Sequence, residues 1–157
     1  MLMKPKARWT EFQLEGCSSY YLSYLDDIAF EWINQAIWGL ETMKPFCVKG
    51  FLEPYRFLCT VSYWNFHIIV ENEKTVPIPK EDIHYQIAHI NMIEFCQNLY
   101  EDILNAFNEW VYFTDIVDDN YNAEEKSQLL SEKLDKLKAL ILEKEHCFKE
   151  QKYFLLR

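Results

Sequence analysis

The sequence predicts an α+β fold: an antiparallel sheet of about four to five strands, covered on one face by two helices, with a charged C-terminal helix. Three observations lead to this prediction. Apolar residues recur at helical spacing in 23–40 and 91–112, and short strand-like runs lie between these segments. A highly charged helical segment then follows. Because successive strands without intervening helices pair antiparallel, one face of their sheet is left for the helices to cover.

A strand and a helix are expected first. Residues 8–14 alternate in character, which is typical of a strand that is half exposed to water. Residues 23–40 carry an apolar stripe, and Ser23 with Asp26 has the spacing of a capping box at the start of this helix. Gly39 weakens the end of the helix, and Pro45 cannot continue it.

The middle of the chain reads as consecutive strands followed by a second helix. Strands are expected at 46–52, 55–61, 66–71 and 83–88, with a hairpin turn at 62–65 and a loop at 74–80. The second helix spans 91–112, and Asn91 with Glu94 predicts a capping box at its start.

The C-terminal part differs in charge from the rest. Residues 1–122 contain 8 Lys and Arg against 18 Asp and Glu, whereas 123–157 contain 8 against 7. After a polar connection at 115–122, Asn122 and Glu125 are expected to cap a third helix. We therefore expect an acidic α+β domain at 1–122 and a C-terminal helical extension at 123–157. The narrow apolar seam of this extension consists of Leu130, Leu134, Leu137 and Ile141.

Composition argues against several classes of function. A net charge of −9 disfavours nucleic acid and anionic lipid as partners. Only three glycines are present, too scattered to form a phosphate-binding loop. No run approaches transmembrane length, and the first residues lack the apolar stretch of a signal peptide. Five cysteines without a CxxC pair indicate reduced thiols, so a cytoplasmic protein without membrane contact is expected.

No catalytic residue, metal site or cofactor is expected from the motifs. The histidines have no metal-ligand spacing. Cys59 and His84 could meet across strands, although a buried core cysteine is the better interpretation. An enzyme remains an alternative, and it would require His67, His84 and acidic groups to converge in a pocket.

Two tryptophans do not fit the apolar stripes. Trp38 lies almost opposite the apolar face of its helix, on the side of Asp27 and Glu31. Either the C-terminal helix covers it, or it is offered to a partner. Trp64, at the expected hairpin turn, allows the same two interpretations. An aromatic anchor surrounded by carboxylates suits a basic protein, so Trp38, Asp27, Glu31 and Trp64 are the candidate contacts.

Some of these features resemble a group of small, largely uncharacterised bacterial proteins. The matching pieces are 23–27 (Ser-Tyr-Leu-Asp-Asp), 53–56 (Glu-Pro-Tyr-Arg) and the strand-to-helix passage 83–104, within a similarity that covers roughly 9–112. Some members of this group look like immunity proteins, which neutralise a toxin by covering it. The resemblance implies no catalytic residue, and the charged tail departs from it.

We therefore expect a non-enzymatic interaction module, plausible as an immunity protein that binds and blocks a basic toxin domain. Two alternatives remain open. One is a homodimeric structural protein that associates through the seam of the C-terminal helix, and the other is a small enzyme of unknown class.

Overall fold

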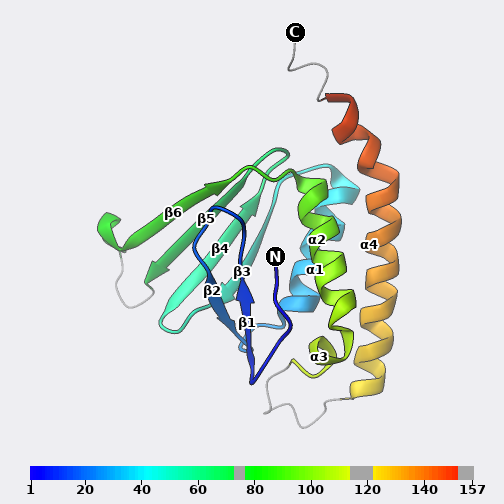
Figure 1. Cartoon of the computed structure of the whole chain (residues 1–157), viewed down its shortest axis with the longest axis horizontal. Coiled ribbons are helices and arrows are strands. Elements are labelled where there is room, and N and C mark those ends of the chain that lie inside the picture. The colour runs from blue at the N-terminus through cyan, green and yellow to red at the C-terminus, as the bar shows by residue number, and fades with distance from the viewer. Residues whose placement is uncertain (73–76, 114–121, 152–157) are drawn as a thin grey trace.

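The computed structural model describes residues 1–72, 77–113 and 122–151 and confirms the α+β class (Figure 1). It contains a two-stranded and a four-stranded sheet, and the helices gather beside the larger one. The strands are β1 (Trp9–Phe12), β2 (Tyr20–Ser23), β3 (Phe46–Phe51), β4 (Tyr55–Val61), β5 (Phe66–Asn72) and β6 (Ile83–Ala88). The helices are α1 (Ile28–Thr42), α2 (Met92–Asn105), α3 (Phe107–Val111) and α4 (Ala123–Gln151), and a 3₁₀ turn spans Lys80–Asp82.

The larger sheet is an antiparallel meander in the order β3-β4-β5-β6. Its strands agree closely with the sequence expectation, and Ser62 N–H donates to the Asn65 carbonyl at 3.0 Å in the predicted hairpin turn. One face of β3, β4 and β5 is buried: Phe46, Val48, Gly50, Phe57, Cys59, Val61, Phe66, Ile68 and Val70. The alternation of the strands therefore separates a covered face from an uncovered one.

An aromatic core lies on the covered face. Trp32 of α1 stacks on Phe57, and Phe95 of α2 packs edge-on against Phe66. The Trp32 indole N–H is satisfied by the Lys49 carbonyl at 2.8 Å. Phe12 of β1 joins the same cluster, so the small sheet and both helices cover one side of the large sheet.

The start of α1 differs from the sequence expectation. The helix begins at Ile28 with Asp27 at the N-cap position, and the predicted helix start at Ser23 is wrong. Tyr20–Ser23 instead forms β2, in which Ser23 pairs with Trp9 of β1. A short apolar run is compatible with strand or helix, and pairing with β1 decides between them here.

The second predicted helix is interrupted. Asn91 and Glu94 do form the predicted capping box, with backbone-to-side-chain distances of 2.9 and 3.0 Å. The helix ends at Asn105, however, and Ala106 has φ −124° and ψ 36°, outside the helical region. The expectation of one continuous helix over 91–112 is therefore wrong, because α3 starts again at Phe107.

The long α4 belongs to the same core as the rest of the chain. The predicted cap is present, because Asn122 Oδ1 accepts hydrogen bonds from Glu124 N and Glu125 N. The apolar seam of Leu130, Leu134, Leu137 and Ile141 is buried within the chain, where α4 packs along α1 and α2. A second copy could reach these four side chains only if α4 left this position, so the seam supports no dimer in this fold. Residues 115–121 of the expected connection at 115–122 and residues 74–76 of the expected loop at 74–80 lie outside the described residues.

Candidate protein-binding surface

Helix α1 has one buried and one outward side. Its apolar residues face the core, and the side at helical spacing from Glu31 contains Asn34, Trp38 and Glu41. Trp38 is 44% exposed, so its side chain is covered only in part. Part of the side chain is accessible, as the interpretation of Trp38 as a partner contact requires. An indole this open is a large apolar group available to a partner.

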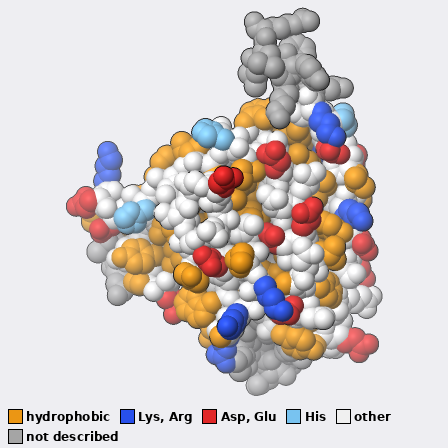
Figure 2. All heavy atoms as spheres, in the orientation of Figure 1, with side chains coloured by type: hydrophobic (Ala, Val, Ile, Leu, Met, Phe, Trp, Pro, Cys, Tyr) orange, Lys and Arg blue, Asp and Glu red, His pale blue; other side chains and the backbone are white. Residues whose placement is uncertain are grey.

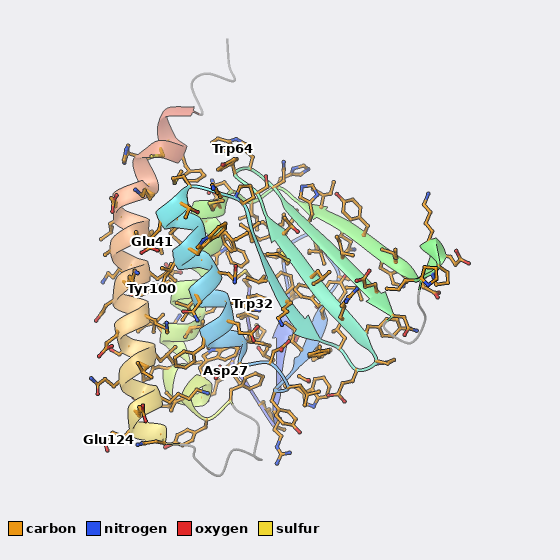
Figure 3. The ribbon with its side chains drawn as sticks, turned by 180° about the vertical axis from the view of Figure 1, so that it is seen from behind. Asp27, Trp32, Glu41, Trp64, Tyr100 and Glu124 are labelled. Carbon is orange, nitrogen blue, oxygen red and sulfur yellow. The ribbon has the colours of Figure 1, made fainter. Side chains whose placement is uncertain are left out.

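The acidic side chains of α1 are paired with basic residues of the same chain. Asp27 Oδ2 lies 2.9 Å from Lys126 Nζ, and Glu41 Oε1 lies 2.6 Å from Lys136 Nζ, both on α4. Figure 3 shows Asp27 and Glu41 toward opposite ends of α1, beside α4. The expected ring of carboxylates around Trp38 is therefore partly neutralised from within. This pairing joins residues about 100 positions apart, so helical spacing on α1 cannot reveal it.

Glu31 has a different environment from Asp27. Its carboxylate lies 4.0 Å from Lys49 Nζ on β3, and both side chains are exposed enough for water to compete with the pair. Burial and the nearby Asp26 carboxylate raise the pKa of Glu31, and Lys49 opposes this rise. Glu31 is the acidic candidate with the weakest internal partner.

The uncovered face of the large sheet is the feature that sequence reasoning missed. Each residue that points to this face from β3 to β6 is exposed or half-buried. Its apolar members include Leu58, Ile69, Ile83, Tyr85 and Ile87. The alternation of side chains along each strand indicated two faces of the sheet. Alternation alone does not say which of the two sets of side chains the helices cover. In Figure 3, this face and α1 are turned toward the same side of the molecule.

Lys49 connects the uncovered face of the large sheet with the outward side of α1. It stands on the uncovered face of β3, and its ammonium reaches Glu31 on the outward side of α1. The uncovered face of β3 therefore adjoins the side of α1 that carries Glu31. On the opposite side, Figure 2 shows acidic side chains dispersed among hydrophobic and uncharged ones, without a single acidic patch.

Trp64 does not join Trp38. It lies at the β4–β5 turn and packs edge-on against Phe148 of α4, with ring centroids 5.6 Å apart (Figure 3). The indole is half-buried and lines a groove of about 490 Å³ between the turn, the start of α2 and the end of α4. Trp64 thus has a structural partner, in line with the alternative that it packs internally.

The histidines do not converge as the enzyme alternative requires. His67 points to the uncovered face of the sheet, where Tyr85 Oη lies 2.5 Å from its Nδ1. His84 points to the other face and lines an aromatic groove of about 570 Å³ with Trp9 and Tyr55. The sheet itself separates these two histidines. His67 and His84 therefore cannot contribute to one site.

The buried thiols also have no nucleophilic arrangement. Cys59 and Cys96 are fully buried, and burial raises the pKa of both thiols far above the ordinary value. Cys59 faces Ile68 and Val48 across the sheet, as a small core residue would. Within 1–72, 77–113 and 122–151, no three His, Cys, Asp or Glu side chains are placed to hold a metal ion.

Comparisons with protein-family models, curated proteins and solved structures give no match to this chain. The fold and its surfaces are therefore the basis for a functional proposal. Among the helices that the structure describes, none is both long and apolar enough to cross a membrane.

Proposed function

We propose that this chain is a non-enzymatic protein-binding module of the immunity type, which binds a basic toxin domain and blocks it sterically. The observation that carries the proposal is the open indole of Trp38 on the outward side of α1. An aromatic side chain of this kind is a typical binding anchor, because it buries a large area and loses little conformational entropy. The net charge of −9 favours a basic partner.

The surroundings of Trp38 assign different roles to the candidate residues. Glu31 can exchange its exposed partner Lys49 for a basic group of another protein, because an exposed pair at 4.0 Å contributes little. Asp27 is held by Lys126, whose side chain is only 12% exposed, so Asp27 serves mainly to hold α4. Trp38 and Glu31 are then the principal contacts, Asp27 holds α4 beside them, and Trp64, which packs on Phe148, lies outside this surface.

The test begins with affinity capture from the native host, with the genomic neighbours of the gene expressed, and continues with the captured protein. A basic polypeptide that arrests growth when expressed alone should become harmless when this chain is co-expressed. Its association rate with the purified chain should fall as salt is added, because screening weakens electrostatic steering. Failure to capture a basic polypeptide, or capture of one without toxicity, would overturn the immunity function.

A matched pair of variants locates the contact. Trp38→Ala should weaken binding by about 2 kcal/mol or more, as expected for removal of a central aromatic anchor. Leu142→Ala removes a more exposed apolar side chain, from α4, and should leave binding unchanged. Equal affinities of the two variants would show that the toxin binds elsewhere.

A further inference from the structure

Strand β6 is the outermost strand of the large sheet and, in the described part of the chain, pairs on one side only. Natural sheets protect such edges with lysine, proline, bulges or inward charges, since an open edge can pair with another strand. β6 has none of these. Its sequence, Ile-His-Tyr-Gln-Ile-Ala, contains no Lys, Arg, Asp, Glu or Pro, and its register with β5 is continuous from Ile83 to Ala88.

The side chains of β6 on the uncovered face are apolar and open to solvent. Ile83, Tyr85 and Ile87 are 37%, 53% and 46% exposed, respectively. A strand with an open backbone edge and an apolar row beside it presents both elements that strand addition uses: main-chain pairing and side-chain contact. The remaining question is which strand fits this edge.

The order of residues along β6 favours a second copy of itself. A two-fold axis perpendicular to a sheet keeps each side chain on its own face, so the centre of an antiparallel self-pairing falls on a residue. With Tyr85 at the centre, Ile83 lies opposite Ile87 of the second copy, and His84 lies opposite Gln86. From Ile83 to Ile87, apolar residues then meet apolar ones and polar residues meet polar ones, whereas Ala88 at the end of the strand lies opposite Asp82.

Other centres fit less well. Centring the pair on His84 would place Ile87 opposite Glu81, and centring it on Gln86 would place Ile83 opposite His89. Each of these arrangements sets an apolar side chain against a polar or charged one. The centre at Tyr85 is therefore the one of these three that sets neither isoleucine of β6 against a polar or charged side chain.

We propose that a second copy of this chain docks on β6, so that two four-stranded sheets join into one continuous sheet about a two-fold axis at Tyr85. The two uncovered faces then form a single, wider surface. This interface is independent of Trp38 and of the toxin-binding proposal. It also differs from the seam of α4, which is occupied within the chain.

Charge and size determine how this dimer behaves. The net charge of −9 opposes the approach of two copies, although β6 itself brings no like charges together. Added salt screens this repulsion and should strengthen the dimer, whereas it should slow binding of a basic partner. A strand of six residues gives an interface smaller than that of a standard stable complex, so the dimer should depend on protein concentration.

Sedimentation equilibrium of the full chain tests the proposal. Wild type should pass from monomer to dimer as its concentration rises through the micromolar range. Tyr85→Lys would place two ammonium groups face to face on the axis and should raise the dimer Kd about tenfold or more. Leu142→Lys makes the same charge change on α4 and should leave the dimer unchanged.

A charge-swap series tests the register and does not depend on Tyr85. Ile83→Lys and Ile87→Glu should each weaken the dimer. The double variant sets the introduced ammonium opposite the introduced carboxylate twice across the axis, so it should restore the dimer. Circular dichroism checks that each variant is folded. A chain that stays monomeric throughout, a dimer that Tyr85→Lys leaves intact, or a double variant no better than the single ones would overturn the proposal.

Discussion

Lys126 Nζ on α4 lies 2.9 Å from Asp27 Oδ2 at the N-cap of α1. The same ammonium reaches the Phe113 carbonyl at 3.3 Å and stands over the Phe30 ring. A residue that looked like part of an acidic binding surface is thus an internal attachment point for the C-terminal helix. The contact ties the first helix of the chain to the last.

This attachment should be measurable as stability. Lys126→Ala removes the partner of Asp27 and should lower the free energy of unfolding by about 1–3 kcal/mol, as for loss of a charged, largely buried partner. Lys136→Ala, which breaks the more exposed pair with Glu41, should cost no more than about 1 kcal/mol. Urea denaturation measures both, and equal losses would show that Lys126 is an ordinary surface lysine.

Gly39 is required by packing rather than tolerated as a weak helix residue. A Cβ at this position would overlap the Phe46 ring, 2.7 Å from its Cε1 and closer still to Cδ1. Gly39→Ala should therefore destabilise the protein by about 1–3 kcal/mol, although alanine itself favours a helix by about 1 kcal/mol. The exposed Gln35→Ala in the same helix is the control. A rise in melting temperature for Gly39→Ala would contradict the expectation.

Glu31 should make stability fall as pH rises. Its pKa in the folded state is raised above the ordinary 4.5, first by burial and then by Asp26, so the folded state holds this proton more tightly than the unfolded chain. The unfolding free energy therefore decreases as pH increases from the ordinary pKa through the raised one. Glu31→Gln should remove this decrease and gain stability relative to wild type toward neutral pH.

The measurement is a series of urea melts between about pH 4 and pH 7. Glu101→Gln makes the same charge change on an exposed part of α2, away from Asp26 and Asp27. If Glu31→Gln and Glu101→Gln change the pH profile by the same amount, the local environment of Glu31 is not responsible.

The three cysteines of the sheet and of α2 should divide into two reactivity classes. Cys47 is exposed on the uncovered face of the sheet, whereas Cys59 and Cys96 are fully buried with raised thiol pKa. Because the thiolate is the reactive species, iodoacetamide should modify Cys47 in the native protein and reach the buried pair only after unfolding. Mass spectrometry of peptides reads this out directly, and native labelling of Cys59 would argue against the described core.

Local sequence signals predicted most of the elements. The capping box at Asn91 and Glu94, the turn at 62–65 and the cap at Asn122 all involve residues a few positions apart. Their chemistry is complete within one segment, so it can be read without knowing the fold. The outward position of Trp38 follows in the same way from helical periodicity, although its exposure does not.

The wrong predictions share a different cause. Tyr20–Ser23 forms a strand because it pairs with β1. The residues around Ser23 carry no local signal of that pairing, so a helix start was predicted there. The single helix expected over 91–112 breaks at Ala106, although no proline or glycine stands there. Neither the strand at Tyr20–Ser23 nor the break at Ala106 is determined by the local sequence alone.

The sequence by itself determined the α+β class, the order of the main elements and the acidic character of residues 1–122. Only the tertiary structure decided which face of the sheet stays open, that the α4 seam is buried inside the chain, and that lysines of α4 pair with Asp27 and Glu41. The physical reason is distance along the chain. Caps and periodicity act over a few residues, whereas burial and ion pairing depend on segments about 100 residues apart that meet only when the core forms.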